Sequence, residues 1–196
     1  MCNRFWCASD VELAGVFVPG SDAKASPEEQ HATIHLSHKK RAISKMRWGI
    51  GGRDKPPVIQ AWAERMLQAD LLARHVREQR CLIPVRGYYE WSKAREPYLV
   101  EVKDRPTFAL AGVWREFVGQ KQFVVVTTRP NSLIKPIHDR MPCVVEEEDF
   151  GLWLEGSCEK ALAKVCLPFP SEAMTITAVT KELELIEAKA VQGSLF

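Results

Sequence analysis

Hydrophobic and polar positions follow a strand-like pattern through the second half of the chain. Five short runs there are rich in β-branched and aromatic residues, and each is bounded by turn-forming or charged residues. This pattern is typical of strands packed on one face. We predict strands at 98–102, 107–114, 123–128, 143–145 and 174–179. Two short helices, at 149–154 and 159–165, are predicted between them.

The first half carries helix signals and a few single strands. Ser9 to Glu12 fits a capping box and predicts a short helix that ends near Phe17. Ser26, followed by a proline and two acids, predicts a second helix start. Apolar residues in 61–76 recur at intervals of three and four, which predicts a helix. Short strands are predicted at 46–48, 81–84 and 87–91.

Many short strands with few long helices predict an α+β fold. We expect a single domain over residues 1–196, built on a mostly antiparallel, barrel-like sheet with short flanking helices. A chain of this length can bury a full hydrophobic core. From about residue 187 we expect a frayed C-terminal tail.

Composition narrows the class of protein. With 46% hydrophobic and 27% charged residues, the chain resembles an ordinary globular protein. A net charge of +2 means that nucleic-acid binding requires a local basic patch. The six cysteines have no CxxC spacing, so we predict reduced thiols in the cytoplasm rather than a disulfide framework. A signal peptide and a long apolar run are both lacking, so no membrane span is predicted.

Cys2 is the first candidate for chemistry. Once Met1 is removed, Cys2 carries a terminal amine and a thiol on adjacent carbons. The amine can condense with an aldehyde, and the thiol can then close on the imine to form a thiazolidine. An accidental cysteine at this position is the alternative, because a single cysteine is a weak motif.

Glu90 is the second candidate. It lies between Tyr89 and Trp91, and strand alternation places its side chain on the opposite face from these two. Apolar surroundings would desolvate the carboxyl and favour a role as a general acid or base. The alternative is an exposed strand glutamate.

His138 and Arg140 belong to the third candidate, a run restricted by Pro136 and Pro142. The histidine next to an acid in a rigid turn favours a functional role as strongly as a structural one. Arg140 suits a phosphate because its planar fork matches two oxygens. The other histidines of 31–45 could suggest a metal site, but a solvated basic segment is favoured, so we predict neither a metal nor a cofactor.

These segments, in this order, resemble the SRAP (SOS response-associated peptidase-like) family, which includes the embryonic-stem-cell-specific 5-hydroxymethylcytosine-binding protein. The shared segments are 1–5, 48–49, 54–57, 80–84, 87–91 and 137–142. The resemblance implies a mixed α/β fold around a barrel-like sheet with a positively charged cleft. It also implies a thiol autopeptidase that removes Met1 and a role in the DNA damage response. Members bind single-stranded DNA and attach the aldehyde of an abasic site as a stable thiazolidine crosslink.

Roles follow by position from this resemblance. Cys2 is expected to be the nucleophile and crosslinking residue, Glu90 and His138 to transfer protons, and Arg4 and Arg140 to contact phosphates. The resemblance further implies a monomer that acts on single-stranded or abasic DNA in the cytoplasm, at the nucleoid when bound. No membrane, metal or cofactor is expected.

The chain departs from the family pattern at several positions. Gln60 stands where the family has an active-site Asn, which moves the amide outward by one methylene. Trp62 replaces a DNA-contacting Arg; it cannot neutralise a phosphate but can stack on an unpaired base. Asn3 replaces a glycine. A basic run replaces the family's Asn-x-Ala-Pro segment and offers further phosphate contacts, from Lys39, Lys40 and Arg41.

Three functions are therefore open. The first is covalent capture of abasic sites through Cys2. The second is a catalytically impaired SRAP-fold module that binds single-stranded DNA or a protein partner without crosslinking, which Gln60 and Trp62 favour. A conventional thiol peptidase that uses Cys2 and His138 is the weakest, because the sequence specifies no peptide-binding groove.

Overall fold

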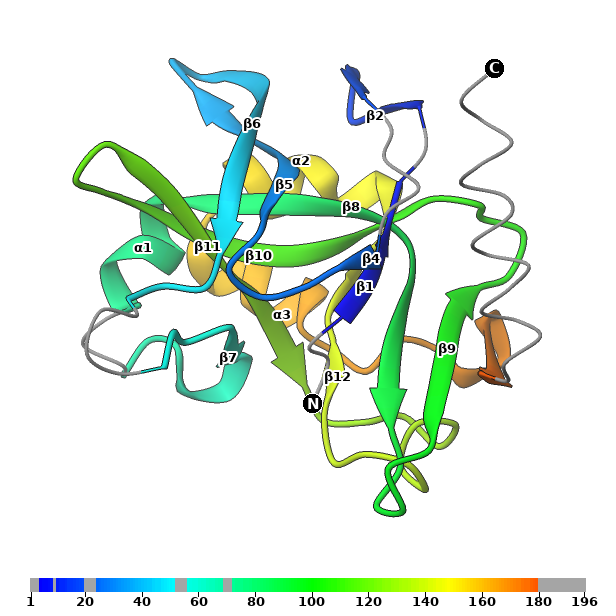
Figure 1. The fold of residues 1–196 in the computed structure, drawn as a ribbon. Coiled ribbons are helices and arrows are strands. Elements are labelled where there is room, and N and C mark those ends of the chain that lie inside the picture. Colours follow the sequence, from blue (N-terminus) through cyan, green and yellow to red (C-terminus); the bar gives the residue numbers. More distant parts are fainter. Residues whose placement is uncertain (1–3, 9, 20–23, 52–55, 69–71, 180–196) are drawn as a thin grey trace.

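Strand β8 (Arg80–Trp91) organises the sheet. The computed structural model describes residues 4–8, 10–19, 24–51, 56–68 and 72–179, and Figure 1 draws its ribbon. The first half of β8 pairs with β10 (Phe108–Phe117) and β5 (Gln30–Ser37). Its second half pairs with β1 (Arg4–Cys7) and β9 (Pro97–Val102). One strand therefore belongs both to the barrel and to the sheet that extends from it.

A ring of five strands closes the barrel. β8 pairs with β5, β5 with β6 (Lys40–Trp48), β6 with β11 (Gln120–Thr128), and β11 with β10, which returns to β8. Within this ring only the β6–β11 pairing is parallel. The α+β class and the mostly antiparallel, barrel-like sheet predicted from the sequence are confirmed.

The remaining elements extend or cover this barrel. A small separate hairpin consists of β2 (Val11–Leu13) and β3 (Val16–Val18). The added strands are β4 (Lys24–Ala25), β7 (Gln60–Trp62), β12 (Met141–Pro142), β13 (Val144–Val145) and β14 (Met174–Ala178). The helices are α1 (Ala73–Glu78), α2 (Phe150–Glu155) and α3 (Cys158–Val165), with 3-10 turns η1 (Ala63–Arg65), η2 (Glu147–Asp149) and η3 (Ser171–Ala173). Within the described ranges no helix is long and apolar enough to cross a bilayer.

A β-bulge marks the point where β8 changes partners. Trp6 pairs with Gly87 but Cys7 pairs with Val85, so Arg86 is the extra residue. A bulge bends a strand and increases its twist. The next residue is Gly87. A side chain has no room there because β9 approaches closely: an added Cβ would lie 2.8 Å from a methyl carbon of Leu99. The Arg86 guanidinium stacks over the Trp6 ring, 4.0 Å from its centroid.

Arg80 joins the helices to the start of β8. Its side chain is buried, and its guanidinium donates hydrogen bonds to carbonyls near the C-terminal ends of α1 and α2. The acceptors include the carbonyls of Val76 at 2.8 Å, Gly156 at 2.6 Å and Trp153. A cation at a helix C-terminus also interacts favourably with the helix dipole. This one side chain therefore satisfies carbonyls that have no partner within their own helices.

Most predicted strands and both later helices are confirmed, with ends shifted by one to a few residues. The strand predicted at 143–145 starts one residue later, and those predicted at 81–84 and 87–91 are one continuous strand, β8. The expected tail from residue 187 lies outside the described residues, as do Cys2 and Asn3.

Two helix predictions before residue 45 are wrong, and the solvated basic segment predicted there is wrong for two of its histidines. The segment that ends near Phe17 is the β2–β3 hairpin, because Ala14 and Gly15 both adopt positive φ and form a two-residue turn. At Ser26 the backbone N–H donates to Glu29 Oε2 at 2.9 Å, as in a capping box, but the chain continues as β5. The basic segment from residue 31 is the β5–β6 hairpin, in which His31 and His35 are buried rather than solvated.

The helix predicted at 61–76 is wrong over its first part. Residues 60–62 form β7, which pairs in parallel with β11 and is followed by η1. Among the described residues of the predicted segment, those from Ala73 are α-helical. Strand pairing with a distant part of the chain thus overrides a local periodicity.

Replacing Arg80 with methionine should lower the free energy of unfolding by about 2–4 kcal/mol, because several buried carbonyls lose their donor. Urea denaturation at neutral pH measures this. The matched control is Arg74→Met, which removes an exposed i,i+4 pair with Glu78 and should change nothing measurable. Equal stabilities of the wild type and Arg80→Met would contradict the anchoring role.

Candidate active site

A turn-rich loop carries His138 back to the end of β11. Asn131 Oδ1 accepts the backbone N–H groups of Leu133 and Ile134, at 3.1 and 2.9 Å. The carbonyl of Ile134 in turn accepts the backbone N–H of His138 at 2.9 Å. The chain then enters β12, which pairs with the end of β11. Hydrogen bonds, in addition to the two prolines, therefore hold the histidine in place.

The backbone of Arg140 can satisfy the His138 ring in either protonation state. The Arg140 N–H lies 3.0 Å from Nδ1 and donates to it when Nδ1 is unprotonated. The Arg140 carbonyl lies 3.2 Å from the same nitrogen and accepts from it when it carries a proton. Burial lowers the pKa of the His138 imidazole, against the Arg140 carbonyl and the Asp139 carboxylate, which raise it. The ring is therefore a proton acceptor near neutral pH.

Arg140 holds three chain segments together. Its Nη1 and Nη2 donate to the two carboxylate oxygens of Glu64 at 3.0 and 2.8 Å, a bidentate pair. Nη2 also donates to the Thr127 carbonyl at 2.6 Å. The side chain is only 13% exposed. Because its fork is already matched to Glu64, a phosphate would have to displace that carboxylate to bind Arg140 in the same way.

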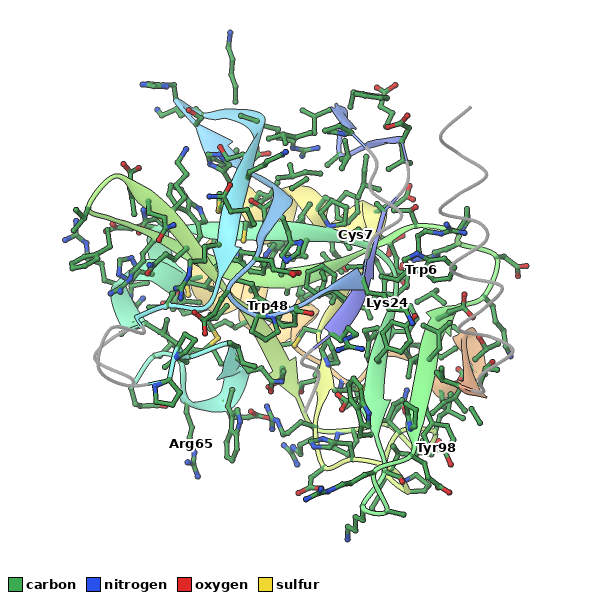
Figure 2. The ribbon with its side chains drawn as sticks, viewed as in Figure 1. Trp6, Cys7, Lys24, Trp48, Arg65 and Tyr98 are labelled. Carbon is green, nitrogen blue, oxygen red and sulfur yellow. The ribbon has the colours of Figure 1, made fainter. Side chains whose placement is uncertain are left out.

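Trp62 displays its indole beside this ion pair. The guanidinium carbons of Arg140 and Arg65 lie 4.9 and 4.6 Å from the ring centroid. The Trp62 side chain is 43% exposed, and Figure 2 shows Arg65 projecting away from the molecule. Trp62 is opposite Thr127 on β11, and strand alternation places Gln60 on the same face of β7. Gln60 and Trp62 thus share a face near the Arg140 ion pair.

Glu90 is buried near the end of β8, with 1% of its surface exposed. The predicted burial is confirmed, and the alternative of an exposed strand glutamate is wrong. Alternation places Glu90 on the same face as Tyr88, which packs in one hydrophobic cluster with Ile134 and Met141. These two residues flank His138 in sequence. The Glu90 face of β8 and the segment that bears His138 therefore both contribute to this hydrophobic cluster.

Arg4 begins β1 opposite Tyr89 and is exposed. Its guanidinium lies over the ring of Trp91, 5.9 Å from the centroid. The ammonium of Lys24 lies over Tyr89, 5.1 Å from that centroid. The face of β8 opposite Glu90 thus carries two aromatic rings with cations over them.

The basic run at the β5–β6 turn lies away from these residues. Lys39 is in the turn itself, with φ of 63°, and Arg41 pairs with Glu155 at 3.1 Å. Figure 1 shows this turn at the opposite end of the barrel from β12. The structure therefore does not bring Lys39, Lys40 and Arg41 together with His138 or Glu90.

Sequence reasoning missed several residues that shape the site. Glu64, Arg65, Thr127 and Asn131 each position another side chain or loop, as described above. Glu64 stands in the same five-residue segment as Gln60 and Trp62, which was the available signal. Across the residues that the structure describes, no group of three or more His, Cys, Asp or Glu side chains has the geometry to hold a metal ion.

Comparisons with known proteins agree with this architecture. A family model described as SOS response associated peptidase (SRAP) matches residues 1–185. The abasic site processing protein YobE of Bacillus subtilis is 26% identical and covers 96% of this chain and 100% of its own length. Another B. subtilis relative, abasic site processing protein YoqW, is 28% identical, with coverage of 79% and 80%.

Solved structures share the fold. An X-ray structure of a Bordetella bronchiseptica protein aligns with a TM-score of 0.79 at 20% identity, covering 91% of this chain and 100% of that one. A phage-related protein from the same organism, also solved by X-ray crystallography, gives a TM-score of 0.76 at 20% identity, covering 92% and 95%.

Glu64→Gln tests the ion pair at the centre of this site. Burial alone would raise the pKa of the Glu64 carboxyl, but hydrogen bonds and the charge of Arg140 outweigh it and lower the pKa. A depressed pKa in the folded state stabilises the fold above the unfolded value, and this contribution is lost as pH falls through the folded value. Because Glu64 is 38% exposed, we expect a loss of only about 0.5–1 kcal/mol at pH 7.

Urea titrations from pH 7 down to about pH 3 measure this difference, which should shrink as Glu64 becomes protonated. Glu78→Gln, in an exposed pair, is the control and should show no difference at either pH. A difference that stays constant across the range would rule out the ion pair as its source.

Proposed function

The chain belongs to the SRAP family, and from that premise we propose that it captures abasic sites in single-stranded DNA as a covalent thiazolidine on Cys2, after removal of Met1. The names of its curated relatives, abasic site processing proteins, support the substrate class. The observation that carries the proposal is the burial of Glu90 on the face of β8 whose Tyr88 belongs to the same hydrophobic cluster as Ile134 and Met141, the residues on either side of His138. An acid and a base are what this condensation needs.

Two proton transfers in this reaction need a protein group. The amine of Cys2 adds to the aldehyde carbon and gives one proton to the former aldehyde oxygen, and a protein acid then protonates this hydroxyl so that it leaves as water. The nitrogen returns its second proton to that acid as the imine forms. The thiol then adds to the imine carbon, and a base moves the thiol proton to the ring nitrogen. We assign the first transfer to Glu90 and the second to His138, because a carboxyl and an imidazole are the side chains that most often carry out such proton transfers.

Chain connectivity supports the role of Cys2. It precedes Arg4 by two residues, so its Cα lies within roughly 7 Å of the Cα of Arg4. Arg4 is opposite Tyr89, the neighbour of Glu90 in sequence. We propose that the terminal aminothiol, joined to Arg4 through one residue, reaches the carboxyl that we assign as the acid.

We propose two kinds of DNA contact, one to phosphates and one to an unpaired base. Arg4 and Arg65 are exposed and suited to phosphates, and Trp62 offers an exposed ring for an unpaired base. Arg140 would act mainly by holding Trp62 and by orienting His138 through its backbone. Lys39, Lys40 and Arg41 are left out of the proposed interface because of their position at the far end of the barrel.

A second function is an SRAP-fold module that binds single-stranded DNA or a protein partner without crosslinking. It is favoured by the bidentate pairing of Arg140 with Glu64, which occupies an arginine that the resemblance assigns to phosphate. Gln60, one methylene longer than the family's asparagine, favours it too.

Incubation of mature protein with an abasic single-stranded oligonucleotide should give an adduct that survives denaturation. Cys2→Ala should abolish it, and Cys2→Ser should leave only a labile imine, because a hydroxyl closes the ring poorly. Cys7→Ser is the matched control and should crosslink like the wild type. Denaturing gels and intact mass follow the adduct.

An undiminished adduct from Cys2→Ala would rule out the mechanism. Mature protein that binds the oligonucleotide but forms no adduct would instead support the second function.

Arg65→Ala should weaken binding to intact single strands and reduce the slope of log affinity against log salt by about 0.7, the value for one phosphate contact. Lys40→Ala, which removes an exposed cation at the far end of the barrel, should leave affinity and slope unchanged. Fluorescence anisotropy with a labelled oligonucleotide measures both. If Lys40→Ala costs as much as Arg65→Ala, the interface runs over the β5–β6 hairpin instead.

A further inference from the structure

A thiol and an imidazole face each other between β1 and β5, apart from the candidate active site. Sγ of Cys7, the last residue of β1, lies 3.9 Å from Nδ1 of His31. Both residues line a cleft of about 190 Å³, which Gln30 and Lys45 also line. In Figure 2, Cys7 follows Trp6 along β1, toward the end of the strand opposite Arg4.

The surroundings orient His31 as a proton acceptor for this thiol. Its Nε2 lies 3.3 Å from the carbonyl oxygen of Ser26, which can only accept, so Nε2 carries the proton in the neutral ring. The lone pair of Nδ1 then points toward Cys7. An edge contact with Phe5 at 5.1 Å and another with Trp48 at 6.3 Å hold the ring. Burial lowers the pKa of His31, and this effect exceeds those of the Ser26 carbonyl and Glu29, which raise it. The lowered pKa keeps the ring neutral near pH 7.

The other cysteines of the described ranges have a different environment. Cys81, Cys143, Cys158 and Cys166 are buried, whereas Cys7 is partly exposed at the cleft. Burial raises the pKa of the thiols of Cys81, Cys143 and Cys158, which suppresses the reactive thiolate. Among these five cysteines, Cys7 therefore combines a thiol that solvent can reach with a nearby proton acceptor.

We propose that Cys7 is a redox modification site, at which its thiol exchanges with a small disulfide that carries a carboxylate. His31 takes the thiol proton, and Sγ attacks one sulfur of the disulfide. The disulfide bond of the small molecule breaks as the new sulfur–sulfur bond forms. The departing half leaves as a thiolate and takes the proton from His31, so Cys7 is oxidised and that half is reduced.

The cleft indicates the class of partner. Its volume admits part of a small disulfide but not a folded protein. Lys45 is exposed at the cleft and can pair with a carboxylate, which favours an acidic peptide disulfide over a neutral one. This reaction requires neither Cys2 nor a DNA substrate, so the experiments below test it independently of the proposed function.

Oxidised glutathione is the probe, used on full-length protein in a Cys2→Ser background so that Cys2 does not compete. Intact mass and peptide mapping should show addition of one glutathione, at Cys7, before any buried cysteine reacts. Cys7→Ser should remove this addition. Modification of Cys7 no faster than of the four buried cysteines would overturn the proposal.

His31→Phe retains an aromatic ring but cannot accept a proton, and should slow the addition by roughly tenfold to a hundredfold. His35→Phe is the matched control: His35 is another buried histidine of β5, with its ring 4.9 Å from that of Trp114, and its loss should not change the rate. Circular dichroism checks that each variant is folded. An unchanged rate in folded His31→Phe would overturn the role of the imidazole.

Lys45→Glu tests the partner class even if His31→Phe fails to fold. It should slow the reaction with oxidised glutathione and leave the reaction with the neutral hydroxyethyl disulfide unchanged. Equal rates with oxidised glutathione in Lys45→Glu and its Cys2→Ser parent would overturn the assignment of an acidic disulfide.

Discussion

The register shift at Arg86 is the constraint on which the rest of the structure depends. Strand β8 must close the barrel with its first half and carry β1 and β9 with its second half. Because side chains alternate with a period of two, one extra residue reverses which face each following side chain occupies relative to β1. The bulge therefore lets Phe5 and Tyr88 pack in the same cluster, and it places Glu90 on that buried face.

Burial favours the neutral form of both His138 and Glu64, but it decides the protonation state only of His138. It keeps the imidazole of His138 neutral, because desolvation opposes its charge. At Glu64 the same effect is outweighed by the bidentate pair with Arg140, and the carboxylate stays ionised. Arg140 connects the two, since its side chain holds Glu64 while its backbone contacts the His138 ring. A change at Glu64 can therefore reach His138 without touching it.

Strand patterns in the second half were predictable because each strand is short, apolar and bounded by its own turn signals. Residues 60–62 were not, because the pairing of β7 with β11 joins positions more than 60 residues apart. The ion pair of Glu64 with Arg140 spans 76 residues and is equally invisible to local pattern. For Lys39, Lys40 and Arg41 the local sequence was informative but not sufficient. It indicates a basic segment, but only the fold shows that this segment lies at the end of the barrel away from β12. The residues themselves indicated Cys2, Glu90 and His138 as candidates, and the resemblance gave them their roles. The structure adds the surroundings of Glu90 and His138.

Trp62, at the position where the resemblance implies an arginine, is still surrounded by positive charge, because two arginines lie beside its ring. The indole has two guanidinium groups over it, and one of them, Arg65, is exposed and not part of the Glu64 pair. On the proposed function, a phosphate that draws Arg65 from the ring exposes more of the indole, and an unpaired base can then stack there. Backbone contact would thus precede base contact. Arg140 would stay paired with Glu64, so the ring would keep one guanidinium beside it while Arg65 leaves. A chain with an arginine at position 62 has no such order of events, because the charge and the ring are not joined in one assembly.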